Sequence, residues 1–497
     1  MPDAALLIRR GRPVDSGIVF ALDSMPLNSD SHWPADYDAR FVGEALLGTL
    51  SVEAGDGSLR TGSALAVERF DGGRRWRVTL DGEAAWSDGL PLSAEHALAS
   101  VRTVLARPRS PLARLLYPEL PTEPAVQVAA DVVDYRFARP VSYVPSLLTL
   151  PQFAPSRESG TGADAPVLGP YEITGRGEDG IRMSLRDRAA DERAGNRPRE
   201  LEFRVFARTR EALDALRRGE IDVSPTTSFS VQDVFDCAGV DGFQSRPISI
   251  FGSLEFGGSS GNLNRRPELR RALGFAVDRE RIAERCPGLV IPFLYQTAPW
   301  SAVPPSSKTW RPTSREIDEL RRELGGSLEI GYADFTPNDV IVRAVCDQLQ
   351  EIFGITAVPR PLSYHAYVRS ALSRDYSLLY TLTTADFPHP ASLLTPWYST
   401  GAVAKRLGFA DAGLDALLDA ASEETDPGAQ AGRWAAADRR WSELMPRIPL
   451  IQVRAHCLSS GRLTGARLNS SGLIDFGRLA AGPRARTAAG PYEEARA

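Results

Sequence analysis

The feature that most constrains the fold is an alternation of short apolar strands with amphipathic helices. Residues 328–332 and 357–361 are predicted strands, and residues 338–353 between them are a predicted helix. A second unit has the same pattern, with a strand at 201–206, a helix at 208–218 and a short strand at 219–223. Further predicted elements are a helix at 39–50, a half-exposed strand at 76–80, a helix capped by Ser93 and two helices within 268–284 that meet at Asp278. Because parallel strands need a long crossover, which is usually a helix, the chain is predicted to be an α/β protein with mixed sheets.

Length and composition set the class of protein. The chain has 497 residues, and at roughly 150 residues per domain this length predicts about three units. Hydrophobic residues make up 43%, charged residues 24%, and the net charge is -5. This composition is typical of a globular protein, and the chain has no excess of positive charge that would attract nucleic acid, so nucleic-acid binding is not expected. No stretch approaches the roughly 18 apolar residues of a membrane span, so we expect a soluble protein.

Neither a secretory signal nor a lipid-anchoring cysteine is visible at the start of the chain. The apolar run 4–8 is followed by Arg9, Arg10 and Arg12, whereas a signal carries its positive charges before the apolar run. The cysteines lie far apart and form no Cys-x-x-Cys pair, so we expect free thiols in the core. If the protein is exported, one or two disulfides are the alternative. The cysteines are Cys237, Cys286, Cys346 and Cys457.

Residues 379–390 end an apolar strand with one acidic residue and a proline-rich turn. Residues 376–382 predict a buried strand, and Pro388 and Pro390 are predicted to exclude both further pairing and a helix. Asp386 lies at the mouth of this strand, where a carboxylate needs a partner. That partner is either internal, such as a backbone amide or an arginine, or it is the ammonium group of a bound ligand.

Several sequence blocks follow one another in a characteristic order. They are the strand at 17–24, Trp86-Ser87-Asp88-Gly89 with Ser93-Ala94-Glu95, Leu168-Gly169-Pro170-Tyr171, residues 212–222, residues 269–279, residues 414–426 and Ile448-Pro449-Leu450. Each block consists mostly of packing and capping residues. Their shared order and spacing along the chain resemble the family 5 extracellular solute-binding proteins of ABC transporters, which include oligopeptide-, dipeptide- and nickel-binding receptors.

The resemblance implies an α/β fold with two lobes, a type II periplasmic-binding-protein clamshell with an extra inserted domain, whose hinge closes over a ligand. Lobe I would be discontinuous, with residues 1–42, 167–261 and 460–497, the inserted smaller domain would hold 43–166, and lobe II would hold 262–459. The resemblance also implies a monomer without a cofactor. It would carry a peptide or an amine-bearing small molecule to the permease and ATPase subunits of an ABC transporter, in the periplasm or at the cell surface.

The resemblance favours a ligand-binding role for Asp386. In peptide-binding members, an aspartate in an Ala-Asp-Tyr-like turn pairs with the α-ammonium group of the ligand, and Ala385-Asp386-Phe387 resembles that turn. Two positions that carry a carboxylate-binding arginine in different members are here Tyr380 and either Ala333 or Asp334. A standard dipeptide or tripeptide is therefore not the expected ligand. A longer or modified peptide or an amine-bearing metabolite fits better, and a nickel complex stays open.

Aromatic residues complete the predicted binding site. Large aromatic residues are more often core than binding residues, but four are candidates for the cleft wall. His389, between two prolines, is predicted to be a structural turn residue. The predicted ligand-binding residues are thus Asp386 and Tyr380, together with Phe387, Trp397, Tyr398 and Trp300.

Two other functions are alternatives to ligand binding for a transporter. Residues 257–261 satisfy Gly-x-Ser-x-Gly, the motif of a serine hydrolase, but no helix follows directly, so a surface loop is the favoured interpretation. The sequence also lacks a phosphate-binding Gly-x-x-x-x-Gly-Lys motif and a His-Glu-x-x-His motif. The missing signal leaves open an intracellular protein that uses the clamshell as a sensor or a biosynthetic enzyme, because a fold does not determine function.

Overall fold

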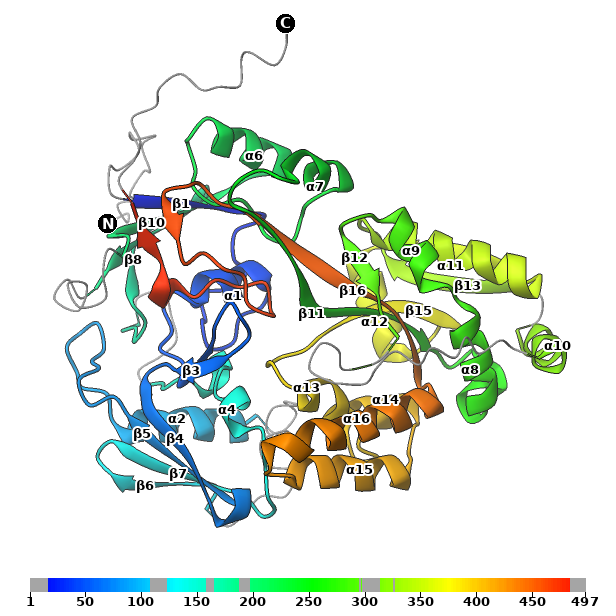
Figure 1. The fold of residues 1–497 in the computed structure, drawn as a ribbon, viewed down its shortest axis with the longest axis horizontal. Coiled ribbons are helices and arrows are strands. Elements are labelled where there is room, and N and C mark those ends of the chain that lie inside the picture. Colours follow the sequence, from blue (N-terminus) through cyan, green and yellow to red (C-terminus); the bar gives the residue numbers. More distant parts are fainter. Residues whose placement is uncertain are drawn as a thin grey trace, which may run out of the picture.

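The computed structural model describes residues 17–107, 123–157, 165–186, 197–294, 296, 313–324 and 327–482. Within these ranges the chain forms three larger sheets, and helices surround each of them (Figure 1). We call them the lobe I sheet, the insert sheet and the lobe II sheet. Two long strands, β11 (Phe243–Phe256) and β16 (Arg447–Leu458), run through the centre of the molecule between the two lobes (Figure 1).

The lobe I sheet joins segments that are far apart in the sequence. Its order is β1-β10-β9-β8, and β1 runs parallel to β10 so that Phe20 is opposite Phe203. The rings of Phe20 and Phe203 stack with centroids 5.3 Å apart, and Phe41 and Phe476 belong to the same core. The elements of this part are β1 (Gly17–Leu22), α1 (Tyr37–Gly43), β8 (Tyr171–Gly177), β9 (Gly180–Leu185), β10 (Glu200–Val205), α6 (Thr209–Arg217), α7 (Val231–Cys237), β17 (Leu463–Thr464), η5 (Phe476–Arg478) and β18 (Ala480–Ala481).

The insert sheet is antiparallel, with order β4-β5-β7-β6. Strand β5 buries Trp76, Val78 and Leu80, the alternation that a half-exposed strand requires. Ser93 and His96 form a capping box at the start of α2, where the sequence predicts a capped helix. The elements are β2 (Ser51–Glu53), β3 (Leu59–Thr61), β4 (Ala64–Phe70), η1 (Asp71–Gly73), β5 (Arg75–Leu80), α2 (Ala94–Leu105), β6 (Ala125–Ala129), β7 (Val132–Arg136), α4 (Val144–Leu147) and η2 (Pro151–Phe153).

The lobe II sheet has the order β12-β16-β11-β15-β13-β14. Its strands β13, β14 and β15 are parallel, so their carboxyl ends lie at one edge of the sheet. The crossover helix α11 (Asn338–Phe353) has the bounds that the sequence predicts. The remaining elements are η3 (Gly261–Arg265), α8 (Pro267–Ala276), α9 (Arg279–Arg285), β12 (Val290–Pro292), α10 (Ser314–Glu323), β13 (Ser327–Ala333), β14 (Thr356–Leu362), α12 (Tyr364–Ser373) and β15 (Leu378–Thr384).

Strands β11 and β16 contribute to two separate hydrophobic cores. They pair antiparallel from Phe243 opposite Leu458 to Glu255 opposite Arg447, with register shifts along the way. At one end Ile248 belongs to the core of the lobe I sheet, and at the other end Leu254 belongs to the core of the lobe II sheet. This strand pair therefore joins the two lobes, and its register shifts make it irregular along the connection.

A group of helices after β15 packs on the insert sheet (Figure 1). Trp397, Trp434 and Trp441 lie in one core with Tyr135 and Phe153 of the insert. The inserted segment and these helices are therefore joined by a continuous apolar interior. The helices are α13 (Pro390–Leu394), η4 (Thr395–Trp397), α14 (Ala402–Leu407), α15 (Ala412–Glu423) and α16 (Pro427–Leu444).

Three local expectations need correction. The helix expected at 39–50 ends at Gly43, because residues 44–46 continue as a turn. The strand expected after Gly219 is reduced to isolated bridges of Val223. Pro390 does not exclude a helix but begins α13, since the first helical position needs no backbone N–H donor.

Two further observations concern the cysteines and the helices. All four cysteines are buried and unpaired, which confirms the expectation of core thiols. Along the described ranges, no helix combines the length and the apolar character that crossing a membrane requires.

Candidate functional site

The segment that carries Asp386 is held at both ends by backbone hydrogen bonds. It follows β15, and the Ala385 N–H donates to the Ser249 carbonyl oxygen of β11 at 2.8 Å. The Asp386 N–H donates to Ser392 Oγ at 2.8 Å, at the start of α13. Ala385 and Phe387 are buried, whereas the Asp386 side chain between them is exposed. The main chain is therefore fixed while one carboxylate is presented to solvent.

The Asp386 carboxylate is accessible but poorly solvated. Among the described residues it accepts no hydrogen bond and forms no ion pair, although solvent reaches its side chain. Protein surrounds it nonetheless, and this desolvation raises its pKa, while the positive charge of Arg40 acts in the opposite direction. An accessible carboxylate in a desolvating environment is the arrangement expected inside a cleft, where a cationic partner would stabilise its charged form.

Phe387 and His389 attach this segment to the insert. The ring of Phe387 stacks on Tyr143 with centroids 6.0 Å apart, and the His389 ring lies 5.5 Å from Tyr143 and 5.3 Å from Trp434. His389 Nδ1 accepts a hydrogen bond from the Ala391 N–H at 3.1 Å and so caps α13. The predicted structural role of His389 is confirmed, and the buried ring of Phe387 acts as an anchor for the turn.

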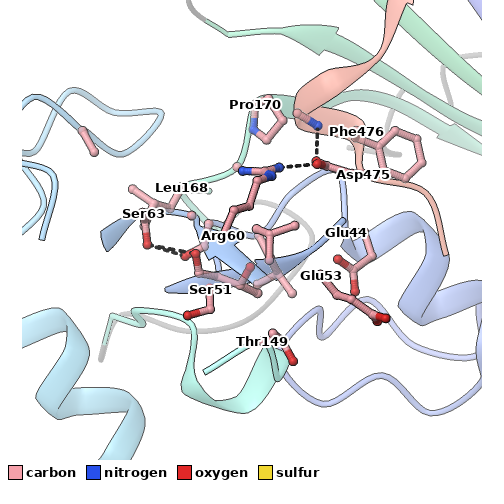
Figure 2. Close-up of a pocket in the computed structure, with 18 of the residues that line it drawn as sticks. Glu44, Ser51, Glu53, Arg60, Ser63, Thr149, Leu168, Pro170, Asp475 and Phe476 are labelled. Carbon is pink, nitrogen blue, oxygen red and sulfur yellow. Dashed lines mark hydrogen bonds and ion pairs between the residues drawn. The ribbon is translucent and has the colours of Figure 1, made fainter. Parts of the chain in front are cut away.

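A cavity of about 590 Å³ adjoins this segment (Figure 2). Pro388 contributes to its lining, and the rest of the wall comes from α1, the β2–β3 hairpin and the segments 168–170 and 469–477. The cavity thus lies where lobe I meets the insert and is touched by the turn after β15. Its charged lining residues include Arg40, Glu44, Glu53, Arg60 and Asp475.

Most of these charges are satisfied by neighbouring protein groups. Figure 2 shows Arg60 directed at Asp475, with which it forms an ion pair, and Asp475 also accepts a hydrogen bond from the Gly477 N–H at 3.0 Å. Glu53 accepts hydrogen bonds from Ser470 N–H at 3.2 Å and Ser470 Oγ at 2.8 Å. These groups hold the hairpin and the C-terminal segment together around the cavity.

Arg40 and Glu44 are only loosely paired. They lie one turn apart at the end of α1, and Arg40 Nε is 3.8 Å from Glu44 Oε1, outside hydrogen-bond distance. Desolvation raises the pKa of Glu44 to about 7, with Arg40 opposing the shift and the negative charges of Asp475 and Glu53 adding to it. Near neutral pH a large fraction of Glu44 is therefore protonated, and it holds Arg40 weakly.

Of the predicted site residues that the structure describes, none lines this cavity, and from the Asp386 turn only Pro388 does. Tyr380 is 1% exposed in the core of the lobe II sheet. Trp397 is also 1% exposed and packs against Trp441, with centroids 5.5 Å apart. Tyr398 is half-buried and donates a hydrogen bond to Asp419 at 2.9 Å. Trp300 lies outside the described residues. Among the predicted residues that the structure describes, Asp386 alone is both exposed and polar.

The serine of the Gly-x-Ser-x-Gly match is placed in a turn that lacks the geometry of a nucleophile elbow. Ser259 follows β11, and its N–H donates to the Tyr376 carbonyl oxygen at 3.2 Å. Ser260, the next residue, donates to the Ser377 carbonyl oxygen. The element that follows is the 3-10 helix η3. A nucleophile elbow requires a sharp turn from a strand into an α-helix. This segment instead closes the end of the lobe II sheet.

Two groups near the site were missed by sequence reasoning. Arg40 and Glu44 form an i, i+4 pair, which in a sequence indicates an ordinary exposed salt bridge. Glu255, on β11, is a buried carboxylate at the centre of a cluster with Arg406 and Arg447. No local signal distinguishes these residues, because their partners come from other parts of the chain.

Comparison with known proteins gives the family. Residues 59–405 match "Bacterial extracellular solute-binding proteins, family 5 Middle". A comparison with curated proteins finds no match.

Solved structures agree in fold. The murein tripeptide binding protein MppA of Escherichia coli is 18% identical with a TM-score of 0.76, covering 94% of this chain and 98% of its own. Haemophilus influenzae OppA in complex with RPPGFSPFR is 16% identical with a TM-score of 0.76, over 94% and 99%. AgaA of A. tumefaciens in complex with agropinic acid is 17% identical with a TM-score of 0.77, over 95% and 99%.

The matched family consists of extracytoplasmic binding proteins rather than enzymes. The match covers most of the chain, and the full-length structural likeness shows a two-lobed fold with an additional inserted part. The chain therefore belongs to the family 5 bacterial extracellular solute-binding proteins and has their type II clamshell fold.

Proposed function

We propose that this protein captures a peptide-like or amine-bearing ligand at Asp386 and delivers it to an ABC importer outside the cytoplasm. The observation that carries the proposal is the Asp386 carboxylate, which is accessible and desolvated and has no partner within the described ranges. An ammonium group would supply both the missing charge and the missing hydrogen bonds. Because Asp386 follows the lobe II sheet and Pro388 of the same turn lines a cavity whose wall includes α1 of lobe I, a ligand that reaches from Asp386 into this cavity would touch both lobes.

Closure is the expected output of binding. A ligand shifts an equilibrium between open and closed states only as far as it binds one of them more tightly. A molecule held by Asp386 on one side and by lobe I on the other contacts both sides only in the closed state. The permease and ATPase partners would then recognise that state, which is how such a protein would report that it is loaded.

Asp386→Ala is expected to weaken ligand binding at least thirtyfold. Losing one member of a desolvated ion pair costs about 2–5 kcal/mol, and about 2 kcal/mol corresponds to that factor. Native mass spectrometry of gently purified protein, with identification of any released molecule, names the ligand, and titration of that molecule into wild type and variant measures the loss.

The matched control is Asp375→Ala, which removes an exposed carboxylate just before β15. It should leave the affinity unchanged. Equal affinities of wild type and Asp386→Ala for the identified ligand would overturn the proposed role of Asp386. A bound molecule that is chemically altered during incubation would instead indicate an enzyme.

A further inference from the structure

The loop between β7 and α4, residues 137–143, reaches from the insert to the helices that follow β15. We call it the insert loop, and we call α13–α16 the helix group. Arg139 of the insert loop forms an ion pair with Asp419 of α15, and its guanidinium carbon lies 5.5 Å from the ring centroid of Tyr398. The Tyr398 hydroxyl donates to the same Asp419 carboxylate at 2.9 Å. One carboxylate of the helix group thus accepts hydrogen bonds from both sides of the contact.

Further contacts connect the insert to the helix group. The Ser142 N–H donates to the carbonyl oxygen of Ser422, on α15, at 2.9 Å. The rings of Tyr143 and Trp434 meet edge to face with centroids 6.2 Å apart. From β4 of the insert, Arg69 Nη1 donates to the Thr425 carbonyl oxygen at 2.5 Å. The contact therefore combines an ion pair, hydrogen bonds and an aromatic pair.

Each side of this contact is also held within its own part of the molecule. Trp76 Nε1, in the insert sheet, donates to the Val141 carbonyl oxygen at 2.8 Å, and the Val141 N–H donates to the Gly73 carbonyl oxygen at 3.0 Å. On the other side, Arg270 of α8 donates to the carbonyl oxygen of Leu444, the last residue of α16, at 2.6 Å. These bonds do not depend on the contact, so both surfaces can keep their shape when they separate.

The contact leaves some polar groups unmet. The apolar core continues from the insert into the helix group, yet Ser142 Oγ and Trp434 Nε1 are buried without a hydrogen-bond partner among the described residues. Water would satisfy both groups if the surfaces separated, and this opposes the contact. The ion pair lies near solvent, since the side chains of Arg139 and Asp419 are 21% and 43% exposed. These features are expected of a contact that opens, because a permanent core satisfies its buried polar groups.

We propose that the insert loop is a latch, which holds the helix group against the insert and biases the clamshell towards its closed arrangement in the absence of ligand. A contact that exists in only one of two states stabilises that state by its own free energy. The latch would therefore reduce the binding energy that a ligand has to supply for closure. The inference goes beyond the proposed function and holds for any ligand, because the clamshell fold by itself provides the motion.

Pulsed electron resonance on the ligand-free protein tests the latch. Spin labels are attached at Gln127→Cys on β6 and Ala416→Cys on α15, two exposed positions on opposite sides of the contact. The native cysteines are buried and should not take up label. A short distance between the labels should be the main population. Arg139→Gln should lower the ratio of short to long distances about fivefold, and adding Tyr143→Ala should lower it further.

Arg136→Gln is the matched control, because Arg136 lies next to the insert loop but pairs with the exposed Glu123 of the insert itself. It should leave the distribution of distances unchanged. Two results would overturn the inference. One is a wild-type protein in which the long distance dominates. The other is a double variant of Arg139 and Tyr143 that keeps the wild-type ratio of distances and has only a lower free energy of unfolding, since the contact would then be a permanent core. The measurement uses no ligand, so neither result bears on the proposed role of Asp386.

Discussion

Replacing Glu255 with alanine is expected to destabilise the folded protein by about 3–5 kcal/mol, because the change leaves the buried Arg447 and the half-buried Arg406 without their shared counterion. Arg406 of α14 forms hydrogen bonds of 2.6 and 2.9 Å to the two oxygens of Glu255, and Arg447 of β16 adds one of 2.7 Å. The Tyr376 hydroxyl donates to the same carboxylate. Glu255 is 1% exposed, so water cannot replace these contacts.

The two arginines keep the Glu255 carboxylate in its charged form. Burial alone would raise the pKa of Glu255, but the hydrogen bond from Arg406 and the charges of Arg447 and Arg406 outweigh it and lower the pKa to about 2. The cluster thereby ties α14 to the two strands that run between the lobes. Loss of Glu255 should loosen this attachment as well as lower the overall stability.

Chemical denaturation by urea measures the loss. The matched control is Glu329→Ala, which breaks the ion pair of 3.1 Å with Arg360 on the adjacent strands β13 and β14. Both partners of that pair are largely exposed, and its removal should cost no more than about 1 kcal/mol. If the two variants lost similar stability, the buried cluster would not be a major support of the fold.

Acidification from pH 7 to pH 5 is expected to lower the free energy of unfolding, because His456 and His389 resist protonation in the folded state. Desolvation lowers the pKa of His456 to about 4, with Arg454 contributing, and lowers that of His389 to about 3. The unfolded chain takes up these protons near pH 6.5 while the folded state resists them, so stability falls as the pH drops below that value. At pH 5 each histidine should cost about 2 kcal/mol relative to pH 7.

The surroundings of the two rings explain the shifts. His456 lies between Phe229 and Phe243, with ring centroids at 5.3 and 6.0 Å, and neither of its nitrogens has a partner in the described structure. Arg454 is the charged group that acts on it. His389 is enclosed by Tyr143 and Trp434, and its shift comes from burial alone. Neither site offers a carboxylate that could stabilise an imidazolium.

Two variants remove the titrations with little change of packing. His456→Leu deletes no side-chain hydrogen bond, and His389→Asn keeps an acceptor for capping α13. Each should flatten the dependence of the unfolding free energy on pH between 7 and 5 relative to wild type. An unchanged slope in both variants would show that other groups cause the loss at acid pH.

The site shows where sequence reasoning succeeds and where it stops. Asp386 could be found because a lone carboxylate after a buried strand stands out locally, and because the family resemblance adds a role. The sequence could not show which aromatic candidates belong to the core and which to a binding site, because a buried ring and a ring at a binding surface look alike in a sequence. Tyr380 and Trp397 belong to cores whose other members come from distant segments.

The sequence by itself determined the local elements and the class of fold. Strand alternation, helix periodicity and capping act over a few residues, so α11, the junction of α8 and α9 at Asp278, and strand β5 could be predicted. Only the tertiary structure decided which charges meet, as Glu255 does with Arg406 and Arg447. These contacts join residues far apart in the chain, and electrostatic interactions depend on distance and burial rather than on sequence order.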